Sequence, residues 1–241
     1  MTLQIIHVSD THISKDVPQR LKDLENCVDA INALDETPDL VVHTGDITHH
    51  GLAQEYHIAR QLLDKLKAPY FVMAGNKDKR PQLLSEFSDP RYLLPKQGWV
   101  QYSIEHHPVR LLMLDTLSSA SNKGKLCAER LEHLENMLEA DTTKPVALFL
   151  HHTPFEAVGI PDPYQYEDWI DVHKLEKLLS RFPNICGMYC GHVHRFIDGE
   201  IAGIKVSAIS CVAGDLRKGE VTDKERQQPI FKLLSLPEIA K

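Results

Sequence analysis

The chain has 241 residues and a mass of 27.4 kDa, with 42% hydrophobic and 25% charged residues. This composition excludes collagen-like, low-complexity and disordered chains, and the length suffices for one large α/β domain with a sizeable core. The net charge is −7 and no run of four basic residues occurs, which disfavours a protein that binds nucleic acid through a positive face.

In the first third of the chain, apolar runs of strand length alternate with segments of helical period, as in βαβ units. The apolar runs predict strands at residues 3–8, 40–44 and 70–73. The helical periodicity predicts helices over residues 21–34 and 53–66, and a third helix after Pro81.

The rest of the chain continues the alternation after a predicted hairpin. Strands are expected at 100–104 and 109–114, joined by a turn at His107-Pro108, and then at 146–150 and 185–190. Helices are expected at 128–138 and 172–179, with a loop at 160–169 that carries three aromatic residues. The tail from 195 to 236 is expected to form short strands around Gly199, Gly203 and Gly214.

We therefore predict an α/β fold in a single domain over residues 1–241. The longest apolar stretches are far shorter than the roughly 18 residues that cross a membrane, so no membrane partner is expected. The N-terminus has no basic region, apolar region or cleavage site of a secretory signal, which predicts a cytoplasmic protein with reduced cysteines. Cys186 and Cys190 lie in an apolar run, so we expect them to pack in a strand rather than to bind zinc.

The chain is rich in histidine, with 14 residues, and several of them stand directly after predicted strands. The five strand ends carry Asp10-Thr11-His12, Gly45-Asp46, Gly75-Asn76-Lys77-Asp78, His151-His152 and Gly191-His192-Val193-His194. The carboxyl ends of strands in an open α/β sheet line its ligand crevice, so side chains far apart in sequence can meet there.

Each of these motifs also has an ordinary structural explanation. An aspartate after a strand caps a helix, Gly45-Asp46 and Gly75-Asn76 are typical of turns, and His151 and His152 are compatible with buried, hydrogen-bonded imidazoles. Their joint occurrence favours a metal site. Carboxylates, imidazoles and one amide without a thiolate suit Mn²⁺, Fe²⁺, Co²⁺ or Zn²⁺. Seven ligands are too many for one ion, so we expect two divalent ions.

With these motifs, the chain resembles the calcineurin-like metallophosphoesterases. The family pattern D-x-H, G-D-x4-G, G-N-H-D/E, H and G-H-x-H is matched in order from Asp10 to His194, and the stretch after Gly51 is similar to the small bacterial branch. That branch contains class III cyclic nucleotide phosphodiesterases and glycerophosphodiesterases. The resemblance implies a four-layer α/β/β/α sandwich with a dimetal site between the sheet edges.

The resemblance also implies a role for each matched residue. The first ion would be held by Asp10, His12 and His194, the second ion by Asn76, His151 and His192, with Asp46 as the bridge. A hydroxide that bridges the ions would be the nucleophile. The two ions, less the charges of Asp10, Asp46 and the hydroxide, leave about one positive charge to receive a phosphodiester anion.

The chain departs from the family pattern at one position, where Lys77 replaces the histidine thought to steady the transition state or protonate the leaving oxygen. Lysine supplies positive charge, but its ordinary pKa of about 10.4 makes it a poor proton donor near pH 7 unless it is desolvated. The alternative is an exposed lysine tolerated in a loop. We assign Lys77 and His152 as the candidate catalytic residues. We expect His49 and His50 on the surface of the loop after Asp46, with a position facing the substrate as the alternative for either residue.

The favoured function is hydrolysis of a small phosphodiester, either a 3′,5′-cyclic nucleotide or a glycerophosphodiester, by a dimetal enzyme. The alternatives are a non-catalytic scaffold with this fold or a phosphomonoesterase, and a nuclease is disfavoured because no basic groove is apparent. Nucleic acid is therefore not an expected partner, and a homo-oligomer is compatible with the sequence.

Overall fold

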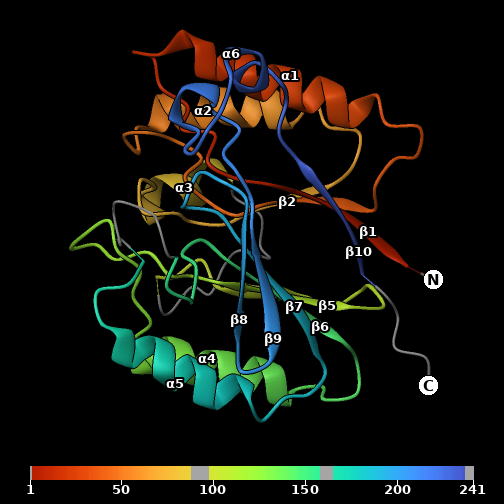
Figure 1. Cartoon of the computed structure of the whole chain (residues 1–241), viewed down its shortest axis with the longest axis vertical. Helices are drawn as coiled ribbons and strands as arrows, with labels where there is room; N and C mark the ends of the chain where they lie inside the picture. The colour runs from red at the N-terminus through yellow and green to blue at the C-terminus, as the bar shows by residue number, and fades with distance from the viewer. Residues whose placement is uncertain (1, 88–97, 158–164, 237–241) are drawn as a thin grey trace.

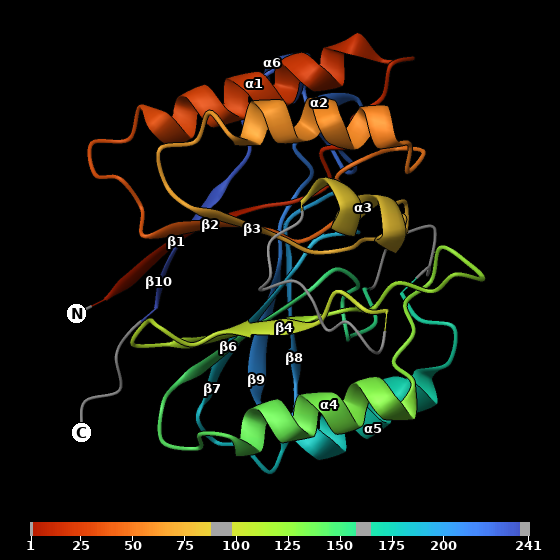
Figure 2. The ribbon, with the colours of Figure 1, turned by 180° about the vertical axis from the view of Figure 1, so that it is seen from behind.

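The computed structural model describes residues 2–87, 98–157 and 165–236. Two sheets face each other, and each is covered by helices on its outer side, so the molecule has the predicted four layers (Figure 1 and Figure 2). The fold class expected from the sequence is therefore confirmed.

The first sheet has the strand order β10-β1-β2-β3. Its strands are β1 (Leu3–Val8), β2 (Leu40–His43), β3 (Tyr70–Val72) and β10 (Lys232–Leu236). The first three are parallel, and β10 lies antiparallel to β1 at the edge. The outer layer on this side consists of α1 (Pro18–Asn32) and α2 (Ala53–Leu63), with α3 (Arg80–Glu86) and α6 (Asp223–Arg226) beside them (Figure 2).

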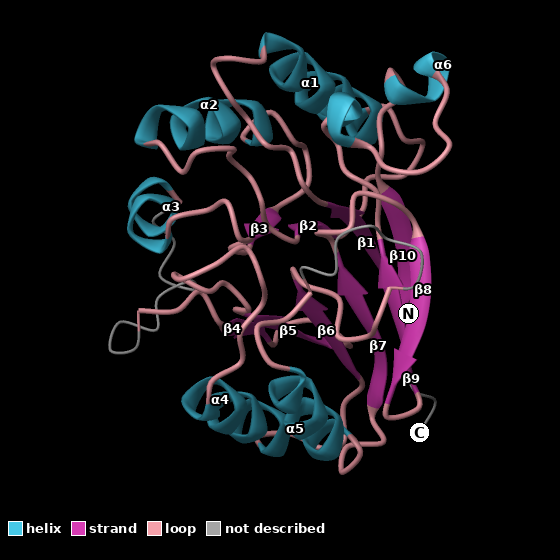
Figure 3. Ribbon diagram, turned by 60° about the vertical axis from the view of Figure 1, so that its left-hand side comes forward, coloured by secondary structure: helices cyan, strands magenta, loops and turns pink. Residues whose placement is uncertain are grey.

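The second sheet has the strand order β4-β5-β6-β7-β9-β8 (Figure 3). Its strands are β4 (Tyr102–Ile104), β5 (Arg110–Leu114), β6 (Val146–Leu150), β7 (Ile185–Cys190), β8 (Ile197–Ile201) and β9 (Ile204–Ala208). The four inner strands are parallel, and β4 and β8 pair antiparallel at the edges. Its outer face is covered by α4 (Ala128–Glu139) and α5 (Trp169–Leu179).

The alternation of side chains along β5 and β6 explains why these strands are apolar throughout. Leu111 and Met113 face the core shared with the first sheet, whereas Leu112 and Leu114 face the core under α4 and α5. Successive residues of a strand point to opposite faces, so a strand covered on both faces reads as a continuous apolar run.

The predicted strands and helices are present, but α1 spans residues 18–32 rather than 21–34, and neither α6 nor β10 was predicted as a separate element. The hairpin between β4 and β5 is confirmed, but Gly214 begins a short 3-10 helix, Gly214–Leu216, instead of lying in a strand. Trp169 begins α5 rather than ending a loop, because the Asp168 carboxylate accepts a hydrogen bond from Ile170 N and caps the helix there. Part of the expected aromatic loop lies outside the described residues, and helix α2 ends at Leu63 rather than at residue 66.

The described residues contain no helix that is both long and apolar enough to cross a lipid bilayer. The cysteines in this part of the chain are all free thiols, and Cys186 and Cys190 lie in β7 as expected. Cys190 is buried, which raises the pKa of its thiol well above the ordinary value.

Candidate metal centre

The predicted metal ligands converge at the carboxyl ends of β1, β2, β3, β6 and β7, where the two sheets face each other. They form two neighbouring clusters. We define the first cluster as Asp10, His12, Asp46 and His194, and the second cluster as Asn76, His151 and His192. The donor atoms of the first cluster all lie within 4.8 Å of one another.

Short distances join the residues of the first cluster. The Nε2 atom of His12 lies 3.1 Å from Nε2 of His194 and 3.5 Å from Oδ2 of Asp46. Asp10 Oδ1 lies 3.3 Å from Nε2 of His194 and is buried without a hydrogen-bond partner among the described residues. Three of these side chains are almost completely buried, and His194 is slightly exposed.

The second cluster is centred on the amide oxygen of Asn76. This oxygen lies 3.1 Å from Nε2 of His151 and 2.9 Å from Nδ1 of His192. The two clusters share Asp46, because its Oδ1 lies 3.6 Å from Nε2 of His151. Every ligand predicted from the sequence therefore lies in one continuous group.

The backbone at these positions is unusual. Five of the predicted ligands have positive φ angles: Asp10, His12, Asp46, His192 and His194. This left-handed conformation is disfavoured for residues other than glycine and is concentrated at functional sites. The close approach of the loops also demands glycines, since a Cβ atom at Gly191 would lie 1.9 Å from Ser9 Oγ and 2.5 Å from Asp10 Oδ2.

We call the ring nitrogen of a cluster histidine that points away from the cluster its outer nitrogen. The hydrogen bonds of the outer nitrogens indicate which atoms of the clusters carry lone pairs, and therefore whether cations fit between them. The Nδ1 atom of His151 donates to the carbonyl oxygen of Thr44 at 2.8 Å, and Nδ1 of His194 donates to that of Leu216 at 3.1 Å. In a neutral imidazole the other nitrogen then carries a lone pair.

Lone pairs therefore face other acceptors in both clusters. Nε2 of His194 points at Asp10 Oδ1 and at Nε2 of His12, and Nε2 of His151 points at the Asn76 oxygen. Acceptors repel one another at these distances unless a cation lies between them, so the residues fit divalent metal ions.

The carboxylates of Asp10 and Asp46 also indicate that a cation fits between the clusters. Burial and the nearby charges of Asp10 and Asp78 raise the pKa of Asp46 well above its ordinary value. Burial also opposes ionisation of Asp10, but His12, His151 and His194 hold the pKa of this carboxyl well below its ordinary value. A cation would stabilise the ionised form of both groups.

Asp78, to which the sequence analysis gave no role, is buried on the loop that also carries Asn76. Its carboxylate accepts hydrogen bonds from Ile47 N at 3.2 Å, Gly75 N at 2.9 Å and the Tyr56 hydroxyl at 2.9 Å. Asp78 therefore fixes the positions of the bridging and amide ligands relative to each other.

Lys77 and His152, the candidate catalytic residues, lie beside the second cluster. The backbone N–H of Lys77 donates to Asp46 Oδ1 at 2.6 Å, and its half-buried side chain places Nζ 3.5 Å from Oδ1 of Asn122. His152 is fully buried; its Nδ1 accepts from the Thr116 hydroxyl at 2.8 Å, and its Nε2 donates to the Asn122 carbonyl at 3.2 Å. Both ring nitrogens of His152 thus have protein partners.

Of the two histidines expected on the loop surface, only His50 is exposed. Its Nδ1 atom lies within hydrogen-bond distance of Oε1 of Glu55, at 2.8 Å. His49 is half-buried, and its ring faces that of His12 with the centroids 5.5 Å apart. Its proximity to a predicted ligand has no signal in the sequence.

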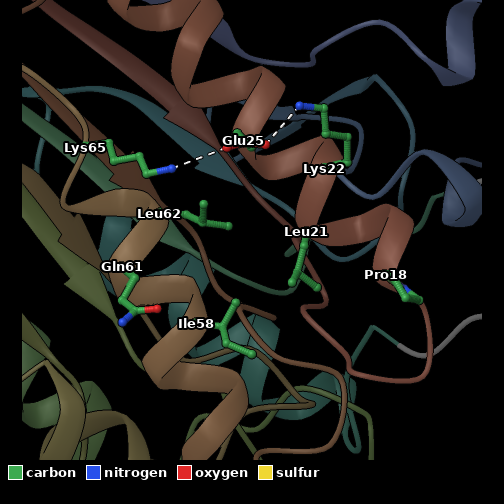
Figure 4. Close-up of a pocket in the computed structure, with 8 residues that line it drawn as sticks. All are labelled: Pro18, Leu21, Lys22, Glu25, Ile58, Gln61, Leu62 and Lys65. Atoms are coloured by element: carbon green, nitrogen blue, oxygen red, sulfur yellow. Dashed lines mark hydrogen bonds and ion pairs between the residues drawn. The ribbon is translucent and has the colours of Figure 1, made fainter.

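A groove outside this centre lies between α1 and α2, and Figure 4 shows the eight residues that line it. Its volume of about 640 Å³ is within the range of small-molecule sites. Its floor is apolar, and Glu25 on its rim already pairs with Lys22 and Lys65. It therefore offers no group of convergent polar side chains comparable to the two clusters.

Comparison with known proteins identifies the family. The family model described as calcineurin-like phosphoesterase matches residues 3–196. The chain belongs to this family. The resemblance drawn from the strand-end motifs is thus confirmed, and so is the expectation of an enzyme.

Curated relatives lie in the bacterial branch expected from the sequence. The chain is 34% identical to a probable glycerophosphodiester phosphodiesterase GpdQ of Arcobacter nitrofigilis over 79% of this chain and 71% of that protein. It is 27% identical to the 3′,5′-cyclic adenosine monophosphate phosphodiesterase CpdA of Vibrio vulnificus, over 86% of this chain and 75% of that protein.

A solved structure has the same fold at low sequence identity. A dimetal phosphatase from Danio rerio superposes with a TM-score of 0.78 at 15% identity, covering 98% of this chain and 93% of the other. The shared fold spans nearly the whole chain, which includes the segments that carry both clusters.

Proposed function

We propose that the protein is a metal-dependent phosphodiesterase that hydrolyses a small phosphodiester at the two clusters. The observation that carries this proposal is the set of facing acceptors, His194 Nε2 against Asp10 Oδ1 and His151 Nε2 against Asn76 Oδ1. Two divalent ions of the Mn²⁺, Fe²⁺, Co²⁺ or Zn²⁺ type are the groups that this donor set suits. When bound, such a pair supplies Lewis-acid activation of the phosphoryl group and of water.

The residues of the chain then have distinct roles. Asp10, His12 and His194 hold one ion, Asn76, His151 and His192 hold the other, and Asp46 is shared by both. Lys77 binds a phosphoryl oxygen by its charge, because its backbone is fixed to Asp46 and its ammonium group lies at the edge of the second cluster. His152 supports this edge by holding the Asn122 carbonyl, next to the Lys77 ammonium.

A glycerophosphodiester is our first choice of substrate and a 3′,5′-cyclic nucleotide the second. The relatives named glycerophosphodiester phosphodiesterases are 34% and 33% identical to this chain, each over 79% of it. A probable cyclic nucleotide phosphodiesterase of Rhodopseudomonas palustris is also 34% identical, but over 70% of this chain, and the cyclic AMP phosphodiesterase of Vibrio vulnificus is 27% identical. A small substrate also fits a chain that we regard as one domain without a nucleic-acid partner. A cytoplasmic location stays a prediction.

The test is a panel of initial rates with Mn²⁺ on a glycerophosphodiester, cyclic AMP, a nitrophenyl diester and a nitrophenyl monoester. We expect hydrolysis of the diesters, with the glycerophosphodiester the best natural substrate, and loss of activity after chelation. A faster rate on the monoester would identify a phosphomonoesterase. No rate on any of the four substrates, with metal bound, would favour a scaffold.

A further inference from the structure

The outer nitrogens of His12, His151 and His194 have hydrogen-bond partners of different kinds. His151 and His194 donate from Nδ1 to backbone carbonyl oxygens, those of Thr44 and Leu216. His12 has a different partner, because its Nδ1 lies 3.4 Å from Nδ1 of His49. Of these three rings, His12 is therefore the one whose outer partner is a side chain.

The role of His12 as a metal ligand determines which ring nitrogens of His12 and His49 carry a proton. A neutral imidazole that offers Nε2 to a metal carries its proton on Nδ1, and this proton must be donated to an acceptor. The neighbouring acceptor is Nδ1 of His49. For Nδ1 of a neutral His49 to accept this hydrogen bond, His49 must carry its own proton on Nε2.

The backbone holds the two rings in this arrangement. His12 N–H donates to Asp46 O at 2.9 Å, and His49 N–H donates to Ile13 O at 3.0 Å. The loops that follow β1 and β2 are thus paired in a parallel register, with a bridge between Ile13 and Thr48. The register sets the His49 ring edge-on to the His12 ring, with an angle of 66° between the planes.

The loop is also fixed beyond His49. The buried Glu55 carboxylate accepts hydrogen bonds from the backbone N–H groups of His50 and Leu52. The His50 ring lies edge-on to the His49 ring, with the centroids 4.7 Å apart. The His49 ring therefore contacts the rings of both His12 and His50, on a loop whose backbone is hydrogen-bonded to Glu55.

We propose that His49 is a positioning residue. Its Nδ1 accepts a hydrogen bond from the Nδ1–H group of His12 and thereby keeps the Nε2 lone pair of His12 directed into the first cluster. This inference rests on the proposed function in that it presupposes an ion at the first cluster. Partners of this kind typically change metal affinity by 10- to 100-fold.

The first experiment measures binding of Mn²⁺ by calorimetry. His49→Phe keeps a planar ring but removes the acceptor, and His49→Asn retains an acceptor oxygen. His57→Phe is the matched control, since His57 is an exposed histidine of α2. We expect His49→Phe to bind one of two ions about 10- to 100-fold more weakly, and the other two variants to bind both ions as the wild type does.

The second experiment follows the ring protons by ¹⁵N NMR of the zinc-loaded protein. We expect a slowly exchanging proton on Nδ1 of His12 in the wild type and in His49→Asn, and its loss or rapid exchange in His49→Phe. Should His49→Phe fail to fold, His49→Ala gives the same comparison.

The outcomes separate the two proposals. Wild-type protein that binds no divalent ion contradicts the proposed function, and the role of His49 falls with it. Wild-type protein that binds two ions, together with unchanged affinity and an unchanged His12 proton in His49→Phe, overturns the positioning role alone. A loss of affinity in His49→Asn equal to that in His49→Phe would also overturn it.

Discussion

The two clusters use similar numbers of donors but differ in charge. The first cluster contains two buried carboxylates, whereas the second is built from imidazoles and the neutral amide of Asn76 and reaches a carboxylate only through the shared Asp46. Lys77 adds a positive charge on the side of the second cluster. In the proposed dimetal centre we therefore expect one ion to be held firmly and the other to exchange, with the Asp46 carboxylate shared by the two clusters.

Removal of the shared carboxylate is expected to have the largest effect. Asp46→Asn should lower the rate of phosphodiester hydrolysis by about 10³-fold, or roughly 4 kcal/mol of barrier, because both clusters lose their common negative charge. Initial rates at saturating Mn²⁺ test this, with the exposed Asp16→Asn as the control. A loss of less than tenfold, equal to that of Asn76→Ala, would show that the chemistry does not depend on the bridge.

The next effect concerns the charge beside the second cluster. Lys77→Ala should reduce the rate by about 10²-fold, the usual cost of removing one donor to the transition state, while Lys79→Ala should not. The ratio of nitrophenyl to alkyl diester rates distinguishes charge from proton donation. If proton donation limits the reaction, Lys77→His should improve the alkyl diester selectively. Wild-type rates for Lys77→Ala on both substrates would make Lys77 a bystander.

A negative charge added to the second cluster should reduce the difference in Mn²⁺ affinity between the two clusters. After loading with Mn²⁺ and dialysis, we expect the wild type to retain more than one ion per chain but to lose most of the second. Asn76→Asp places a carboxylate where the amide now lies, and should tighten the weaker ion by about tenfold, which is about 1.4 kcal/mol. Elemental analysis gives the retained stoichiometry. Fewer than one ion in the wild type would contradict the dimetal assignment.

The acid stability of the fold is expected to depend on His7, a buried histidine that belongs to neither cluster. Burial, with a contribution from Lys232, lowers the pKa of His7 to about 3. The unfolded chain binds this proton below about pH 6.5 and the folded chain does not, so stability is present above that pH and is lost as the pH falls towards 3.

His7→Leu should therefore flatten the acid side of the stability profile. The slope of the free energy of unfolding of the metal-free protein should decrease by at most about 1.4 kcal/mol per pH unit between pH 6 and 4. Denaturant unfolding at several pH values measures it. The loss of the bond to Thr44 lowers stability by about 1 kcal/mol at pH 7.5, which serves as the reference for each profile. An unchanged slope would mean that His7 is protonated in the folded state.

The sequence predicted the order of the elements from β1 to β9 because the strands covered on both faces read as apolar runs and the helices carry one apolar face, but it predicted neither α6 nor β10. The turn at Gly214 was missed for a reason that is not local, since its N–H donates to Asp23 on α1 at 2.8 Å. The start of α5 was missed although it had a local signal, the capping residue Asp168.

The candidate ligands could be found in the sequence because each follows an apolar strand. The geometry that makes the clusters could not be found in this way. The left-handed backbone at Asp10 and Asp46 arises from hydrogen bonds between loops, such as Asp10 N to Gly45 O at 3.0 Å. The approach of His49 to His12 and the burial of both nitrogens of His152 likewise depend on which loops pair across the sheets.

The pairing of β10 with β1 has a consequence for how the chain is made. Leu3 pairs with Leu236, so β1 gains its outer neighbour only after residues 232–236 have been synthesised. Until then one edge of β1 is open, and an open apolar edge is where strands of different chains associate. A contact between residues so distant in sequence also slows folding. A nascent chain that already carries every predicted ligand thus still exposes its first strand, and shortening the chain before Lys232 would make that exposure permanent.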